Sequence, residues 1–155
     1  MNNTNSVAAL FARLALGTAF LSAVASRFSV WPKTMGGGSW QGFMEYVAEL
    51  NPWAPESLIS FLGGAATIAE LTFGILLILG FKQRLIGILA GILLMIFALS
   101  MTVGTGVKSP FDYSVYTAAA ASFLYAVSSP SLWSLDSLFA RHPLSAKISK
   151  NLIAE

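Results

Sequence analysis

Four runs of apolar residues divide the chain, and each is long enough, or nearly so, to cross a bilayer. A membrane-spanning helix needs about 20 predominantly apolar residues. The sequence therefore predicts an all-α membrane protein, a bundle of four transmembrane helices with no room for a separate soluble domain. The predicted spans are 7–27, 57–81, 85–103 and 110–128, and an amphipathic basic tail follows over 130–155.

The fourth run is the shortest, and a helix-start signal precedes it. Ser109 is suited to the N-cap, Pro110 to the first helical position, and Asp112 to closing the capping box. This arrangement predicts one continuous helix of about 18 residues, which ends before the next proline.

The connection over residues 28–56 is long, and part of it has helical periodicity. Trp40, Phe43, Val47 and Leu50 fall on one face of a helix, and polar residues fall on another. This pattern predicts a short interfacial helix on the extracytoplasmic side of the bundle. The alternative is a loop anchored in the interface by its tryptophans.

Composition supports the membrane assignment and removes several chemistries. The chain is 55% hydrophobic and only 10% charged, with a mean hydropathy of +0.70. It contains no cysteine, which excludes a disulfide relay, a thiolate nucleophile and cysteine-ligated metal centres. The one histidine, His142, lies in the tail, so we expect neither histidine-ligated haem nor another metal site.

Basic residues predict the orientation. With four spans, one side of the membrane carries five basic residues near the helix ends and the other side carries three. This excess places both termini in the cytoplasm. The five are Lys82 and Arg84 in a turn, with Arg141, Lys147 and Lys150 in the tail; the three are Arg27, Lys33 and Lys108.

Glu70 is the only formal charge within the second apolar run. A carboxylate at the bilayer centre costs about 2.5–3.5 kcal/mol, so it needs a counter-ion, a bundle interior or a water-filled cavity. Arg13, inside the first run, is the predicted partner, because a depth difference of about 7 Å is within reach of its side chain. The pair could be a structural lock, or Glu70 could serve a ligand or a proton, and the sequence leaves both open.

Small residues recur at four-residue spacing in three of the runs. Such stripes allow helix backbones to approach closely in lipid, and they favour packing within one chain over a homo-oligomer interface. The stripes are Ala15, Ala19 and Ala23; Gly87 and Gly91; and Ser114, Ala118, Ser122 and Ala126.

Several of these positions together resemble the DoxX family of small four-helix membrane proteins. The resemblance runs from Arg13 to about Val127. It is carried by Arg13-Leu14-Ala15-Leu16-Gly17, Phe20-Leu21, Arg27-Phe28, Glu70-Leu71-Thr72-Phe73-Gly74, Arg84, Gly106-Val107-Lys108-Ser109-Pro110 and Tyr113-Ser114-Val115.

The resemblance implies a protein of the bacterial cytoplasmic (inner) membrane and leaves two functions open. One is a quinone-linked oxidoreductase component, in which Arg27 and Lys108 attract an anionic reductant such as thiosulfate and Glu70 moves a proton. The other is a non-catalytic scaffold or assembly subunit held by the Arg13–Glu70 pair. Proton transport through Glu70 is a third and weaker possibility, because one carboxylate without further polar groups makes a poor pathway. The expected partners are the lipid bilayer, quinone and a redox or assembly protein, and not a nucleic acid.

Overall fold

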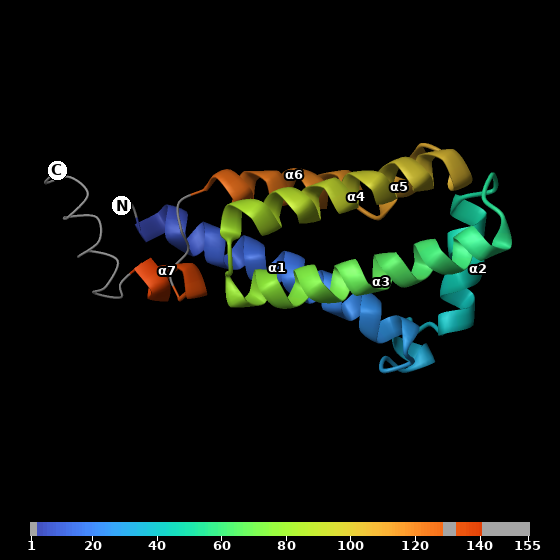
Figure 1. Cartoon of the computed structure of the whole chain (residues 1–155), viewed down its shortest axis with the longest axis horizontal. Coiled ribbons are helices and arrows are strands. Elements are labelled where there is room, and N and C mark those ends of the chain that lie inside the picture. Colours follow the sequence, from blue (N-terminus) through green and yellow to red (C-terminus); the bar gives the residue numbers. More distant parts are fainter. Residues whose placement is uncertain (1–2, 129–132, 141–155) are drawn as a thin grey trace, which may run out of the picture.

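The computed structural model of the chain describes residues 3–128 and 133–140 (Figure 1). Every regular element within these ranges is a helix, which confirms the all-α prediction. In chain order they are α1 (Asn3–Arg27), the 3-10 helix η1 (Lys33–Met35), α2 (Trp40–Leu50), α3 (Glu56–Leu79), α4 (Gln83–Thr105), α5 (Lys108–Asp112), α6 (Val115–Val127) and α7 (Leu135–Ala140).

Three helices, α1, α3 and α4, are long and apolar enough to cross a membrane. The fourth apolar helix, α6, has 13 residues. At 1.5 Å per residue it is about 20 Å long, shorter than a hydrocarbon core of about 30 Å. It lies along α4 and completes a four-helix arrangement (Figure 1).

The prediction of one continuous helix from Ser109 is wrong. The segment forms the short α5, and then a break separates it from α6. Ser114 adopts a left-handed conformation with φ 56°, which interrupts the helical hydrogen-bond ladder. Val107 occupies the N-cap of α5 without a side-chain capping hydrogen bond, so Ser109 lies inside the helix rather than at its N-cap. The local start signal is therefore real in composition but is not used as a cap.

Helices α1 and α3 run antiparallel and touch through two glycines. A Cβ on Gly17 would lie 2.9 Å from the carbonyl oxygen of Gly74, and a Cβ on Gly74 would lie 3.2 Å from the carbonyl oxygen of Gly17. Only glycine allows the backbones to approach this closely. The contact fixes the register between the two helices, and that register decides which charged residues meet.

Helices α4 and α6 form the second close pair. A Cβ on Gly87 would lie 2.8 Å from the Cβ of Ala126, and the Ser122 hydroxyl donates to the Gly87 carbonyl at 3.0 Å. Gly91 lies against the ring of Phe123 in the same way. Two of the predicted small-residue stripes therefore pack against each other within the chain.

One end of the bundle is covered by α2 (Figure 1). The Ser39 hydroxyl accepts from the Gly42 N–H at 3.1 Å and caps the helix at its start. The Met44 side chain rests on Gly63 of α3, and Leu50 at the end of α2 lies against Gly104 of α4. A helix is present where the aromatic spacing predicts one, and it bridges the two helix pairs.

The opposite end, the turn end, consists of Gly80–Lys82 between α3 and α4 and the start of α7. The Asp136 carboxylate accepts from the backbone N–H groups of Lys82 and Gln83, each at 2.8 Å. It therefore acts as an N-cap for α4, supplied from a distant part of the chain. Residues 130–132 and 141–155 of the predicted tail lie outside the described residues.

Candidate functional site

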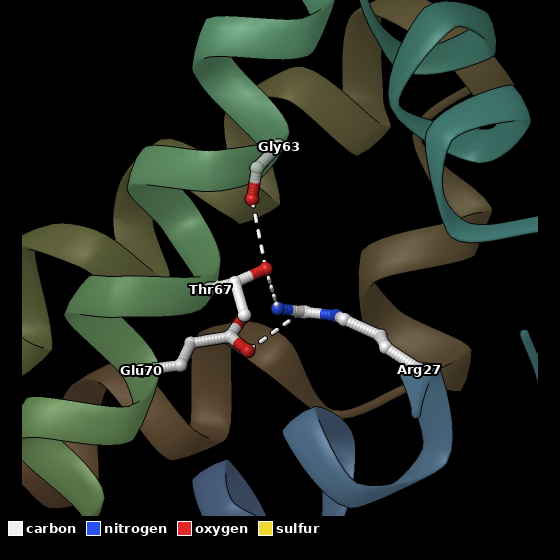
Figure 2. Close-up of polar contacts among 4 residues, drawn as sticks. All are labelled: Arg27, Gly63, Thr67 and Glu70. Carbon is white, nitrogen blue, oxygen red and sulfur yellow. Dashed lines mark hydrogen bonds and ion pairs between the residues drawn. The ribbon is translucent and has the colours of Figure 1, made fainter. Parts of the chain in front are cut away.

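The Glu70 carboxylate is buried and forms a salt bridge with Arg27, not with Arg13. The Arg27 Nη2 and Glu70 Oε2 atoms lie 2.6 Å apart (Figure 2), and 9% and 4% of the two side chains are exposed. Arg27 is in the last turn of α1, and Glu70 is near the middle of α3. Buried charges in lipid need such pairing, so the general expectation for Glu70 is met by another arginine.

Thr67 completes the polar cluster. Its hydroxyl accepts a hydrogen bond from Arg27 Nη1 at 2.7 Å and donates to the Gly63 carbonyl at 2.8 Å (Figure 2). Thr67 precedes Glu70 by about one turn, so both side chains lie on the same face of α3. Together they hold the planar guanidinium at two of its nitrogens and fix its orientation.

A phenyl ring of α2 covers the other side of the guanidinium. The Arg27 Cζ atom lies 3.7 Å from the centroid of the Phe43 ring, a cation–π contact. The indole of Trp40 stacks on Phe28, with ring centroids 5.8 Å apart. The aromatic face of α2 that is visible in the sequence is thus directed at the end of α1 and encloses the ion pair.

The predicted Arg13–Glu70 pair is therefore wrong. Arg13 is buried at the turn end, where its Nη2 donates to the Trp133 carbonyl at 2.6 Å. A Cβ added to Gly80 would overlap the Arg13 guanidinium, which places the two residues in direct contact. Gly80 lies about 15 Å from Glu70 along the axis of α3, at 1.5 Å per helical residue. Arg13 is therefore far from Glu70.

The antiparallel register explains this correction. Gly17 faces Gly74, so residues earlier on α1 face residues later on α3. Arg13 consequently faces Gly80, whereas the end of α1 approaches Thr67 and Glu70. Arg13 is farther from the level of Glu70 than the predicted depths imply, because the depth of a residue in its own helix does not include the register between the two helices.

The direction of helical side chains explains how a residue at a helix end reaches a carboxylate deep in α3. Cα–Cβ bonds tilt toward the N-terminus of their helix. Arg27 at the end of α1 therefore points back into the bundle, toward α3 (Figure 2). A cation in the last turn of a helix also interacts favourably with the helix dipole.

The ion pair lies on the wall of a large cavity. The cavity has a volume of about 660 Å³ and is lined by α1, α2, α3, α4 and α6, mostly with alanine, leucine, phenylalanine and other apolar residues. Ligand pockets of about 300–1,000 Å³ with few, convergent polar groups are typical of small-molecule sites. The polar residues of the wall are Arg27, Tyr46, Asn51, Glu70, Ser100 and Tyr113.

Tyr46 of α2 contributes a phenol to this wall. Burial raises the pKa of the Tyr46 phenol above its usual range, nearby Tyr113 and Glu49 add to the increase, and a hydrogen bond with Ser109 opposes it. Tyr46 is therefore a neutral hydroxyl at physiological pH and can donate or accept a hydrogen bond.

The remaining predicted site residues lie elsewhere. Lys108 is exposed and pairs with Asp112 one turn later on α5. The structure therefore does not bring Lys108 to the buried Arg27–Glu70 pair. Lys82 and Arg84 are exposed at the turn end, as their place between the second and third runs implies. The anion-binding role of Arg27 and Lys108 stays a prediction.

The sequence pattern does not identify Thr67, Phe43, Tyr46 or the cavity as parts of a site. Thr67 carried a usable signal, since it lies on the helical face of Glu70. Phe43 is visible in the sequence only as part of an apolar face. The cavity had no sequence signal, because it arises from how far the two helix pairs separate.

One family of known proteins matches most of the chain. The DoxX family model matches residues 8–104, which include Arg13, Arg27 and Glu70, most of α1 and all of α3. No curated protein and no solved structure gave a match. The match covers more than half of the chain and includes the motifs on α1 and α3 that carry the resemblance. The chain belongs to the DoxX family.

Proposed function

We propose that this DoxX-family protein is a quinone-linked membrane subunit and that its cavity binds the quinone. The single observation that carries the proposal is the apolar cavity of about 660 Å³ with the buried Arg27–Glu70 pair on its wall. A quinone has the matching chemistry, an apolar ring with carbonyl oxygens that accept hydrogen bonds.

The polar groups of the wall suit the two forms of such a ligand. Arg27 has five N–H donors, and Thr67 and Glu70 accept from two of its nitrogens. Arg27 and Tyr46 can each donate to a quinone carbonyl. Glu70 can accept a proton from a quinol hydroxyl or return it, which is the role expected of a positioned carboxylate. Each reduction of a quinone to a quinol takes up two electrons and two protons.

The electrons come from outside this chain in our proposal. The sequence contains no cysteine, and the described residues include no cluster of three or more histidine or acidic side chains that could hold a metal ion. A redox protein partner, or a reductant that reacts with the quinone directly, would supply them. The anionic reductant expected from the resemblance would approach from the side of α2, where Arg27 and Lys108 lie on α1 and α5.

The proposed topology has four spans, with α5 and α6 together as the fourth, in a bacterial inner membrane. Lys82 and Arg84 lie at the turn end, where the positive-inside rule puts the cytoplasm. Helix α2, with Glu45 and Glu49, then lies at the extracytoplasmic interface above the cavity. We propose one DoxX-like domain over residues 1–155, as the sequence predicts.

Quinone content tests the proposal. Protein extracted from native membranes should carry quinone near one equivalent. Protein stripped of lipid and placed in nanodiscs should bind a decyl-tailed benzoquinone, with quenching of the Trp53 fluorescence, because Trp53 lines the cavity. Trp53→Phe should remove most of that quenching without removing binding measured by calorimetry. The absence of quinone in both experiments would overturn the proposal.

A non-catalytic scaffold is the second candidate, and the position of the ion pair favours it. The Arg27–Glu70 salt bridge joins α1 to α3, and the cation–π contact adds α2. Such a cluster can hold a surface for a partner protein without any ligand. This function predicts a stable co-purifying protein and no quinone binding.

A further inference from the structure

We infer that the cavity opens sideways into the bilayer between α3 and α4, and that it takes a ligand with a compact polar head and a long apolar tail. The head lies at the Arg27–Glu70 end and the tail leaves through the opening. This inference rests on the proposed function and adds the route of entry and the class of quinone, a lipid-soluble one.

The arrangement of the helices creates the opening. Close glycine contacts hold α1 to α3 through Gly17 and Gly74, and α4 to α6 through Gly87 and Ala126. Between the two pairs, α3 and α4 meet at their short turn and then diverge toward α2 (Figure 1). The cavity lies between the two helix pairs. It exists because α3 and α4 stay apart there instead of crossing closely.

Two residues identify the rim of the opening. Ala65 of α3 and Ile96 of α4 line the cavity and are also among the exposed residues of their helices, Ile96 by 53%. Ile68 and Leu99, about one turn away, are exposed as well but do not line the cavity. Exposed leucine and isoleucine on such helices face lipid. The wall of the cavity therefore meets the lipid-facing surface at Ala65 and Ile96.

The rim lies at the depth of the hydrocarbon core. Ala65 is about 14 Å along α3 from its start, and Ile96 is about 14 Å along α4 from its end, at 1.5 Å per residue. The two positions are thus at the same level, close to halfway across a core of about 30 Å. An opening at this depth is of no use to a hydrophilic ligand, and it suits an apolar chain.

The other places where the cavity wall reaches the surface do not lie on that lipid-facing side. Tyr46 is on α2, and Trp53 and Tyr113 are beside it, at the end of the bundle. Ala19 and Ala23 also line a second hollow with Trp31 and Met35, so the segment after α1 lies against them. These routes admit a head group from the α2 side, whereas the gap between α3 and α4 admits a tail.

Narrowing the opening tests the inference. Calorimetric titrations in nanodiscs would compare two forms of one benzoquinone, a tail-less form and a decyl-tailed form. The variant Ala65→Trp/Ile96→Trp should raise the Kd of the decyl-tailed form by about tenfold or more and leave the Kd of the tail-less form within about twofold. The control Ile68→Trp/Leu99→Trp should behave like the unmodified protein with both.

The outcomes separate the inference from the proposed function. If the unmodified protein binds neither form, the proposed function fails. If it binds both and the rim variant keeps the same affinity for both, loses both equally, or matches the control variant, the lateral opening is wrong. Should the rim variant not fold, Ala65→Leu replaces it, and an unchanged preference for the tailed form would then overturn the inference.

Discussion

The Arg27 guanidinium and the Glu70 carboxylate lie 2.6 Å apart and join the end of α1 to the middle of α3. The contact neutralises the one charge within the second apolar run. It also places a cation and an anion on the wall of an apolar cavity, and the Thr67 hydroxyl binds the cation beside it. The same residues are thus central to the stability of the bundle and to any ligand that enters it.

Breaking this pair should be strongly destabilising. Arg27→Gln and Glu70→Gln each leave the partner buried and uncompensated, so each should lower the free energy of unfolding by about 3–5 kcal/mol. The double variant should recover part of that loss. Unfolding of the detergent-solubilised protein, followed by circular dichroism, measures all three.

Two controls accompany this double-mutant cycle. Arg13→Gln and Glu70→Gln should combine additively to within about 0.5 kcal/mol, because the two sites are separate. Lys108→Gln, which removes an exposed i,i+4 pair with Asp112, should cost at most about 1 kcal/mol. Coupling between Arg13 and Glu70, or additivity between Arg27 and Glu70, would contradict the register of α1 and α3.

Close packing of α4 and α6 should make Gly87 intolerant of even one methyl group. A Cβ there would lie within 3.1 Å of the Ala126 Cβ, Cα and N atoms. These are backbone atoms or a Cβ bonded directly to the backbone, so they cannot move aside by a side-chain rotation. Gly87→Ala should therefore lower the free energy of unfolding by about 1–3 kcal/mol. Gly64→Ala, where a Cβ would meet nothing within 4 Å, should be neutral or slightly stabilising. Equal effects of the two variants would count against the α4–α6 contact.

Removing the cap of α4 should loosen the turn end. Asp136→Ala deletes the acceptor of the Lys82 and Gln83 N–H groups and should cost about 0.5–2 kcal/mol, the usual range for an N-cap. Glu45→Ala, at an exposed carboxylate of α2, should cost less.

Because the chain has no cysteine, Ser134→Cys offers a single reporter at a buried position. Its labelling by maleimide should accelerate in the Asp136→Ala background, and an unchanged rate would show that the carboxylate does not hold α7.

Topology can be tested with two tags. A reporter fused after Glu155 should be cytoplasmic, whereas a tag inserted at Gly36 should be reached by a membrane-impermeant reagent from outside the cytoplasm. The reason is the excess of basic residues at the end opposite α2. A C-terminal reporter outside the cytoplasm would require an odd number of spans, for example if α6, with its 13 residues, does not cross.

The sequence by itself determined the class of the protein, its long helices, its family and the need of Glu70 for a cationic partner. These follow from local properties: the length of apolar runs, the lack of charge, and the free energy of burying a carboxylate. Helix α2 was also predictable, because its aromatic face repeats at helical spacing.

Only the tertiary structure decided which arginine pairs with Glu70, where the fourth helix breaks and where the cavity lies. Two arginines on α1 could each satisfy the electrostatic requirement, and the choice depends on how far α1 slides along α3. The contact of Gly17 with Gly74 sets that register, and it brings Arg27 to Glu70 and Arg13 to Gly80. The physical reason is that charge complementarity is a property of residue types, whereas register comes from close packing between distant segments.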